Sequence, residues 1–135
     1  MTQSSHFQQL LHAAAAQPEP QRLLFVFAVA ELPADATPAQ RERFLEGQGG
    51  ALTPLMCVDK APAELADFDA LLGESRLAGP PWQVVFAAAL SGRAGRPPSK
   101  SQIEAALQSM VDAVRLGGVG RFAAYGPAGE PVLFS

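Results

Sequence analysis

The sequence predicts a single α/β (α+β) domain built on a mixed sheet of about five strands with about four helices. Two segments, Leu23–Leu32 and Trp82–Leu90, are almost continuously apolar. At about nine residues each they are too short to span a bilayer and suit neighbouring strands covered on both faces. The 135 residues are 48% hydrophobic and 17% charged. That composition is typical of one globular domain over residues 1–135.

Helix and strand alternate through the first half of the chain. Residues Ser5–Gln17 show an amphipathic helix pattern that opens with capping-box spacing and stops at two prolines. The strand Leu23–Leu32 follows. Thr37–Gln40 combines an N-cap threonine, a proline at the first helical position and a capping glutamine, so a short helix begins here and ends near Glu46. Ala51–Val58 is the next strand, and the proline within it predicts either an edge position or regular pairing that starts after Pro54.

The same alternation continues in the second half. A helix is predicted over Pro62–Arg76, and it leads through prolines into the second apolar run. The glycine- and proline-rich segment Ser91–Pro98 is a loop by composition. A fourth helix then begins at Ser99 or at Ser101, because each serine is followed three residues later by Gln or Glu, and it ends at Leu116 before two glycines.

The C-terminal segment is predicted to be a β-hairpin. Arg121–Tyr125 and Glu130–Phe134 flank a Gly-Pro-Ala-Gly turn. The element order is therefore α-β-α-β-α-β-α-β-β. Crossover helices join parallel neighbours and a hairpin joins antiparallel ones, so this order predicts a mixed sheet.

Charge and cysteine content exclude several classes of protein. Ten basic and thirteen acidic residues give a net charge of −3, which is not the basic surface that nucleic acid selects. We find no secretory signal pattern and no apolar stretch of about eighteen residues, so we expect a soluble, cytoplasmic protein with no membrane partner. The single cysteine, Cys57, excludes an intramolecular disulfide and a multi-cysteine metal site within one chain.

One loop has the composition of an anion site. It follows a predicted central strand and precedes a helix, which is where α/β folds often bind phosphate or carboxylate groups. Its side-chain cations and glycine N–H groups are the expected contacts. The loop does not match a P-loop, which has a second glycine and fewer prolines, so a solvated connection is the alternative. The candidate ligand-binding residues are Ser91, Gly92, Arg93, Gly95, Arg96 and Lys100.

The remaining reactive side chains form no catalytic pattern. Cys57 would need a neighbouring base to act as a nucleophile. The two histidines, His6 and His12, lie six residues apart and fall on different faces of the first helix. We therefore expect Cys57 to be a small buried apolar residue, and we assign no catalytic residue, metal ligand or cofactor.

Nearly the whole chain resembles a family of short, uncharacterised bacterial proteins of about this length. The resemblance rests on the segments QPEPQRLLFVF (17–27), ELP (31–33), DATP (35–38) and PLMCVDK (54–60). Members of this family carry the label "ribonucleotide reductase subunit alpha". That chemistry needs a radical-forming cysteine and a redox-active cysteine pair, which one cysteine cannot supply. The resemblance therefore implies no catalytic residue, and this chain is not such a subunit by itself.

Two functions follow from these patterns. The first is a small non-catalytic interaction or accessory domain that binds another protein or a second copy of itself. Its contact would be an edge strand, either 51–58 or the C-terminal hairpin. The second is a binder or enzyme for a small anionic ligand, bearing phosphate or carboxylate, that uses the 91–101 loop.

Overall fold

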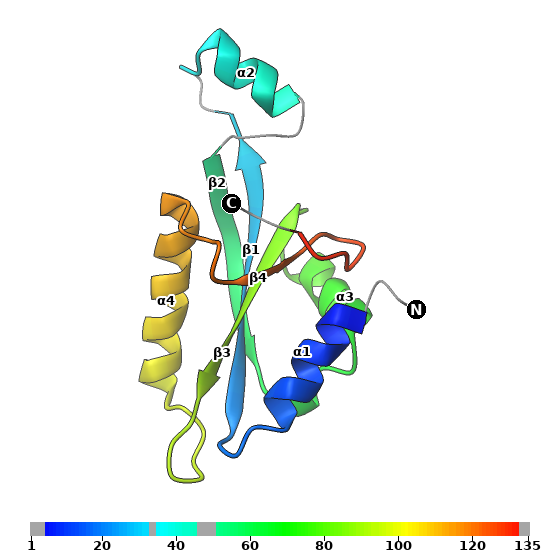
Figure 1. Cartoon of the computed structure of the whole chain (residues 1–135), viewed down its shortest axis with the longest axis vertical. Helices are drawn as coiled ribbons and strands as arrows, with labels where there is room; N and C mark the ends of the chain where they lie inside the picture. The colour runs from blue at the N-terminus through cyan, green and yellow to red at the C-terminus, as the bar shows by residue number, and fades with distance from the viewer. Residues whose placement is uncertain (1–4, 33–34, 46–50, 133–135) are drawn as a thin grey trace.

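The computed structural model describes residues 5–32, 35–45 and 51–132, which form a four-stranded antiparallel sheet with helices on both faces (Figure 1). The strands lie in the order β2-β1-β3-β4. The elements in chain order are α1 (Ser5–Ala15), β1 (Gln21–Glu31), α2 (Pro38–Leu45), β2 (Ala51–Lys60), the 3₁₀ turn η1 (Pro62–Glu64), α3 (Phe68–Ala78), β3 (Val84–Ser91), α4 (Lys100–Leu116) and β4 (Ala123–Tyr125).

The predicted neighbours β1 and β3 do form the centre of the sheet. Phe25 of β1 lies opposite Ala87 of β3 on one side and Val58 of β2 on the other. Residues 23–28 are all buried, as their continuous apolar run predicts for a strand covered on both faces.

Alternate side chains of the central strands enter two separate cores. Helices α1 and α3 cover one face, and α4 covers the other (Figure 1). The first core includes Phe7, Leu11, Leu23, Phe25, Phe27, Leu65, Phe68, Leu71, Trp82, Val85 and Tyr125. The second includes Leu24, Val26, Val84, Phe86, Met110, Val114 and Val119. No helix in the described part of the chain is long and apolar enough to cross a membrane.

The predicted mixed sheet is wrong, because every strand pair is antiparallel. The connection between β1 and β2 explains the difference. Helix α2 lies beyond the end of the sheet and does not cross over a face (Figure 1). Its described side chains are exposed, and its Leu45 is 85% exposed. Because these described side chains do not pack against the sheet, the helix forms part of a reversal, and β2 returns antiparallel to β1.

The predicted fifth strand is also reduced. The C-terminal turn forms, with the N–H of Gly126 donating to the carbonyl of Glu130 and with Gly129 at a φ of 83°. Beyond it, the described residues make one bridge, between Tyr125 and Pro131, and Val132 donates to Ala124. Proline lacks an N–H, so it cannot extend the ladder there. The end of the predicted strand, 133–134, lies outside the described residues.

One predicted helix is divided in the structure, and the structure decides between the two starts predicted for another. The helix predicted over Pro62–Arg76 is split into η1 and α3, because Asp67 takes an extended conformation and caps α3 by accepting from the N–H of Ala70 at 2.9 Å. Of the two starts left open for α4, the structure uses Ser99, which forms a reciprocal capping box with Gln102.

Candidate functional site

Strand β2 forms one edge of the sheet, as Pro54 predicted, and among the described residues it pairs with β1 alone. It is ten residues long, whereas β4 at the opposite edge has three. The register shifts between Phe27 and Ala28, so a β-bulge lies beside Pro54. From Met56 to Lys60 the pairing is regular. This stretch is the candidate site.

The sheet register tells which backbone groups of β2 point outward. The N–H of Gly92 donates to the carbonyl of Pro20 at 2.7 Å, next to the pair Gln21 and Ser91. Hydrogen-bonded residues alternate along an antiparallel strand, so the even-numbered residues of β1 bond to β3. The odd-numbered residues of β1 therefore bond to β2. Val26 and Leu24 are even-numbered, so they form no backbone hydrogen bonds with the residues opposite them, Cys57 and Asp59. Those two β2 residues therefore direct their N–H and C=O groups away from the sheet.

The intervening side chains of β2 face helix α3. Met56 and Val58 lie opposite Phe27 and Phe25 and pack against the same core as α3. Between this edge and α3 lies a groove of about 310 Å³. It is lined by Phe27, Met56, Cys57, Val58, Leu71, Glu74, Ser75 and Ala78. An apolar groove thus runs directly beside the outward-directed backbone groups of β2.

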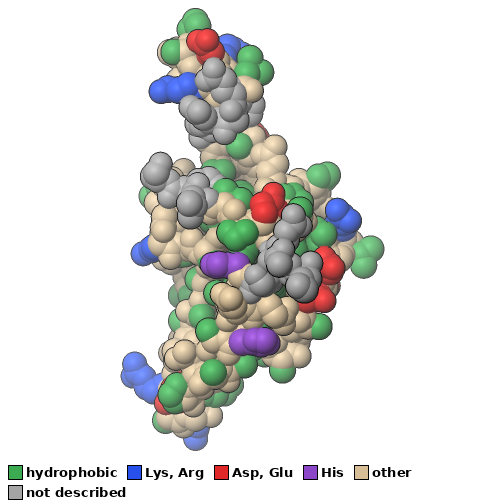
Figure 2. All heavy atoms as spheres, turned by 45° about the vertical axis from the view of Figure 1, so that its right-hand side comes forward, with side chains coloured by type: hydrophobic (Ala, Val, Ile, Leu, Met, Phe, Trp, Pro, Cys, Tyr) green, Lys and Arg blue, Asp and Glu red, His purple; other side chains and the backbone are tan. Residues whose placement is uncertain are grey.

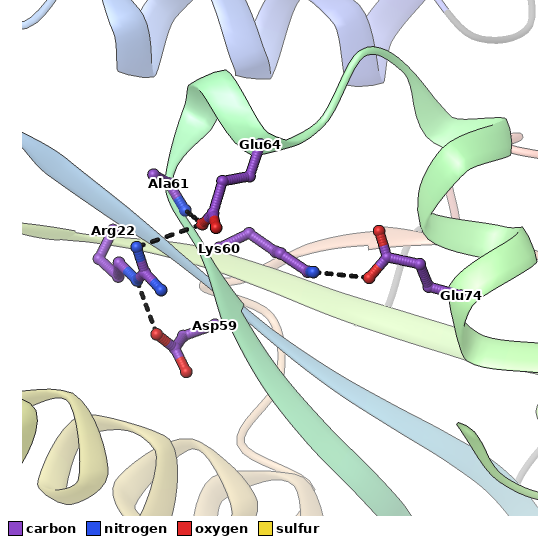
Figure 3. Close-up of polar contacts among 6 residues, drawn as sticks. All are labelled: Arg22, Asp59, Lys60, Ala61, Glu64 and Glu74. Carbon is purple, nitrogen blue, oxygen red and sulfur yellow. Dashed lines mark hydrogen bonds and ion pairs between the residues drawn. The ribbon is translucent and has the colours of Figure 1, made fainter. Parts of the chain in front are cut away.

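Ion pairs lie at the C-terminal end of β2, and one of them includes Glu74 of the groove (Figure 3). Arg22 Nε lies 2.6 Å from Asp59 Oδ2, and Arg22 Nη1 lies 3.3 Å from Glu64 Oε1. Lys60 Nζ lies 2.6 Å from Glu74 Oε1, which joins the end of β2 to α3. These contacts form two separate groups. Arg22 binds two carboxylates and so leaves one excess negative charge, whereas the pair of Lys60 and Glu74 is neutral. The side chain of Glu74 is 48% exposed.

The expectation that Cys57 is buried is wrong, because the thiol is exposed at the β2 edge. Its neighbours along the strand, Met56 and Val58, are half-buried. Residue type favours burial for a lone cysteine, but an edge strand leaves one flank of each residue uncovered.

In the predicted anion loop, the backbone N–H groups bind a carboxylate of the same chain, that of Glu19. Arg93 and Arg96 exchange both backbone hydrogen bonds across a tight turn, with Ala94 at φ 55° and Gly95 at φ 78°. Glu19 accepts from the N–H of Gly95 at 2.7 Å and from that of Ala94 at 3.2 Å. The two expected backbone donors, Gly92 and Gly95, are therefore engaged by the chain itself.

The other candidate residues of this loop are dispersed. Arg93 and Arg96 are opposed across the turn, so they share one face of it, and both are exposed. Lys100 is the first residue of α4, and the hydroxyl of Ser91 donates to the carbonyl of Gly92. Basic side chains project at this end of the molecule, opposite the end that carries α2 (Figure 2). The loop thus carries positive charge but has its glycine donors occupied.

A buried tyrosine contacts a surface histidine. Tyr125 Oη lies 2.7 Å from Nδ1 of His6, and burial raises the pKa of Tyr125 to about 12. The Tyr125 ring also packs edge-on against Phe7, with 5.3 Å between ring centroids. Both histidines are visible on the face shown in Figure 2. Because His6 belongs to α1 and Tyr125 belongs to β4, this contact anchors α1 to the sheet.

Neither a metal centre nor a relative assigns a function to the site. Within residues 5–32, 35–45 and 51–132, no three His, Cys, Asp or Glu side chains are grouped so that they could hold a metal ion. Protein-family models, curated proteins and solved structures yield no match to this chain.

Proposed function

We propose that this chain is a small protein-interaction domain whose β2 edge pairs with an extended segment of a partner protein. The observation that carries the proposal is the outward direction of the Cys57 and Asp59 backbone groups beside an apolar groove. Unpaired N–H and C=O groups on an edge strand are a template for another strand. Backbone hydrogen bonds supply affinity in this mode, and side-chain pockets supply specificity.

The opposite edge is the weaker candidate for such pairing. Strand β4 is flanked by the chain's own C-terminal segment, since Val132 donates to Ala124 and Pro131 bridges Tyr125. Of the two edges that the sequence suggested, the structure thus favours β2 over the C-terminal hairpin. The anionic-ligand function receives less support, because Glu19 already accepts from the backbone donors of the 93–96 turn.

A peptide-display selection tests this proposal. Random peptides are selected on the wild-type protein, and the binders are then measured on Cys57→Pro. Proline removes the outward N–H of this residue without removing a hydrogen bond to β1. We expect the selected peptides to lose at least about tenfold in affinity for the variant, since a tenfold loss corresponds to one or two backbone hydrogen bonds.

Lys100→Pro is the matched control. It places proline at the first residue of α4, where the preceding Ser99 already has an extended conformation, so the helix tolerates it. Binding should equal that of the wild type. If Cys57→Pro does not fold, a bulky maleimide on the exposed Cys57 thiol of the wild type gives the same block. Peptides that bind the blocked protein unchanged would contradict the proposal.

A further inference from the structure

We infer that the partner strand is β2 of a second copy of this chain, paired antiparallel about a two-fold axis that passes through Val58. This inference rests on the proposed function and adds the identity of the partner. Its basis is the run of outward backbone groups on β2, the residues that bound this run, and the open space on both faces of the sheet beside the edge.

The outward hydrogen-bonding groups of β2 form a short run with defined ends. Cys57 and Asp59 direct their N–H and C=O groups away from the sheet. The run ends on one side at Pro54, beside the β-bulge, because proline has no N–H to donate. It ends on the other side at Ala61, whose N–H already donates to Glu64 Oε1 at 2.7 Å. One outward residue on each side of Val58 is therefore available to a partner strand.

Only one symmetric register uses both of these outward residues. In a two-fold pair, outward residues lie opposite outward residues, so the axis can pass through Cys57, Val58 or Asp59. An axis at Cys57 places Asp59 opposite Leu55, which has no partner on β1 because of the bulge. An axis at Asp59 places two carboxylates opposite each other and sets Cys57 against the occupied N–H of Ala61. An axis at Val58 places Cys57 of each copy opposite Asp59 of the other.

The side chains in this register are compatible with one another. Each of the two Cys57–Asp59 pairs exchanges two backbone hydrogen bonds. On the α3 face, Val58 meets Val58 of the second copy at the axis, as a close pair of β-branched side chains. Met56 lies opposite Lys60, whose ammonium is paired with Glu74 of its own copy at 2.6 Å. In none of these pairs do like charges lie opposite each other.

Both faces of the sheet leave room for a strand beside β2. Cys57 lies opposite Val26 of the second core, so its side chain is on the α4 face. The exposure of this thiol shows that α4 leaves the edge uncovered there. On the other face, the groove of about 310 Å³ between β2 and α3 offers space for Val58 and Met56 of the second copy.

An exposed leucine adds apolar surface to the same contact. Leu77 is 92% exposed, and it follows Glu74 of the groove wall by three residues, so the two side chains share one side of α3. Strand β2 of the second copy approaches α3 from this side. A short ladder with few apolar side chains is typical of a small, transient interface, so we expect a dimer that dissociates on dilution.

Disulfide formation tests the register. In the proposed pair, the Cα atoms of the two Val58 residues are about 4.5 Å apart, within the range that a disulfide spans. Those of the two Cys57 residues are about 8–9 Å apart, which is beyond that range. Val58→Cys, made together with Cys57→Ser, should therefore form a linked dimer in oxidised glutathione at least about tenfold faster than the wild type. The wild type is the matched control, because its thiol is exposed.

Sedimentation equilibrium measures the association itself. The wild-type chain should change from monomer towards dimer between about 1 μM and about 1 mM. Cys57→Pro removes an outward N–H from each copy and should weaken dimerisation at least about tenfold, whereas Lys100→Pro should leave it unchanged. If Cys57→Pro does not fold, a bulky maleimide on the wild-type thiol provides the same block.

The outcomes separate this inference from the proposed function. A wild-type chain that stays monomeric over the whole range overturns the self-pairing inference. A Val58→Cys thiol that links no faster than the wild-type thiol also overturns it. In either case, selected peptides that lose affinity for Cys57→Pro leave pairing at the β2 edge standing. If the chain is monomeric and those peptides bind Cys57→Pro as they bind the wild type, both proposals fail.

Discussion

The indole N–H of Trp82 donates a hydrogen bond to the hydroxyl of Ser75, with 2.8 Å between Nε1 and Oγ, and both residues are buried. The Ser75 hydroxyl in turn donates to the carbonyl of Leu72 within α3. The Trp82 ring packs against Phe27 of β1 with 5.1 Å between centroids. This chain of contacts fixes α3 relative to the sheet, and so it sets the width of the groove beside β2.

Replacing Ser75 with alanine tests this contact. The buried indole N–H of Trp82 would lose its acceptor, which costs about 1–3 kcal/mol of unfolding free energy. Denaturant unfolding followed by the fluorescence of Trp82, the only tryptophan, measures this cost directly. Ser109→Ala, the same change at an exposed position of α4, should alter the free energy by less than about 0.5 kcal/mol. Equal effects of the two variants would contradict the role given to Ser75.

Tyr125 predicts a loss of stability at high pH. Burial raises its pKa from 10.0 to about 12, so the folded chain keeps the phenol proton to a higher pH than the unfolded chain does. The contribution of this pKa difference to the free energy of unfolding is complete below pH 10 and is lost as the pH rises from 10 to about 12. Its size is on the order of 2–3 kcal/mol.

Denaturant unfolding at a series of pH values measures this loss, and tyrosinate absorbance reports the only tyrosine. Tyr125→Phe should lack this part of the pH dependence, so the difference between the two proteins isolates the phenol from lysine and arginine titration. A phenol that ionises near pH 10 in the folded wild type would contradict the expected shift.

Glu19 is expected to compete with external anions at the 93–96 turn. Glu19→Ala removes the acceptor of the Ala94 and Gly95 N–H groups, at a cost of about 1 kcal/mol for this solvent-accessible site. Inorganic phosphate should then shift these two amides in NMR spectra of the variant and not of the wild type. Glu104→Ala, which removes the same charge from α4, should behave as the wild type. Saturable shifts in the wild type would favour the anionic-ligand function instead.

Two glycines should respond to alanine in opposite directions. Gly73 lies in α3, and a Cβ there would meet nothing within 4 Å, so Gly73→Ala should raise the unfolding free energy by about 0.5–1 kcal/mol. A Cβ at Gly92 would collide with the carbonyl oxygen of Arg96. Gly92→Ala should therefore lower it by about 1–3 kcal/mol. Thermal unfolding of both variants provides the comparison, and a stabilising Gly92→Ala would contradict the turn geometry.

Local patterns in the sequence predicted the elements well but not their directions. The apolar runs of β1 and β3 encode burial on both faces, and Pro54 encodes an edge. Strand direction depends on where a connecting helix packs. The segment 38–45 has little apolar surface to place against a sheet, and that signal was present in its composition.

The groove and the occupied turn depend on contacts that no local pattern reveals. Glu19 and Gly95 lie 76 positions apart, so a loop that looked like an anion site gave no indication that its donors were taken. The α3 helix could be predicted from its apolar spacing. The strand order alone decides which strand α3 lies beside. The exposure of Cys57 and the position of Glu74 in the groove both depend on that order.

Amide hydrogen exchange at β2 tests the central claim most directly. The labelled protein is measured alone and saturated with a peptide from the display selection. Pairing along the edge predicts that the N–H groups of Cys57 and Asp59 exchange at least about tenfold more slowly in the complex, because both acquire acceptors. Protection confined to another region, such as 91–101, with Cys57 and Asp59 unchanged, would contradict it.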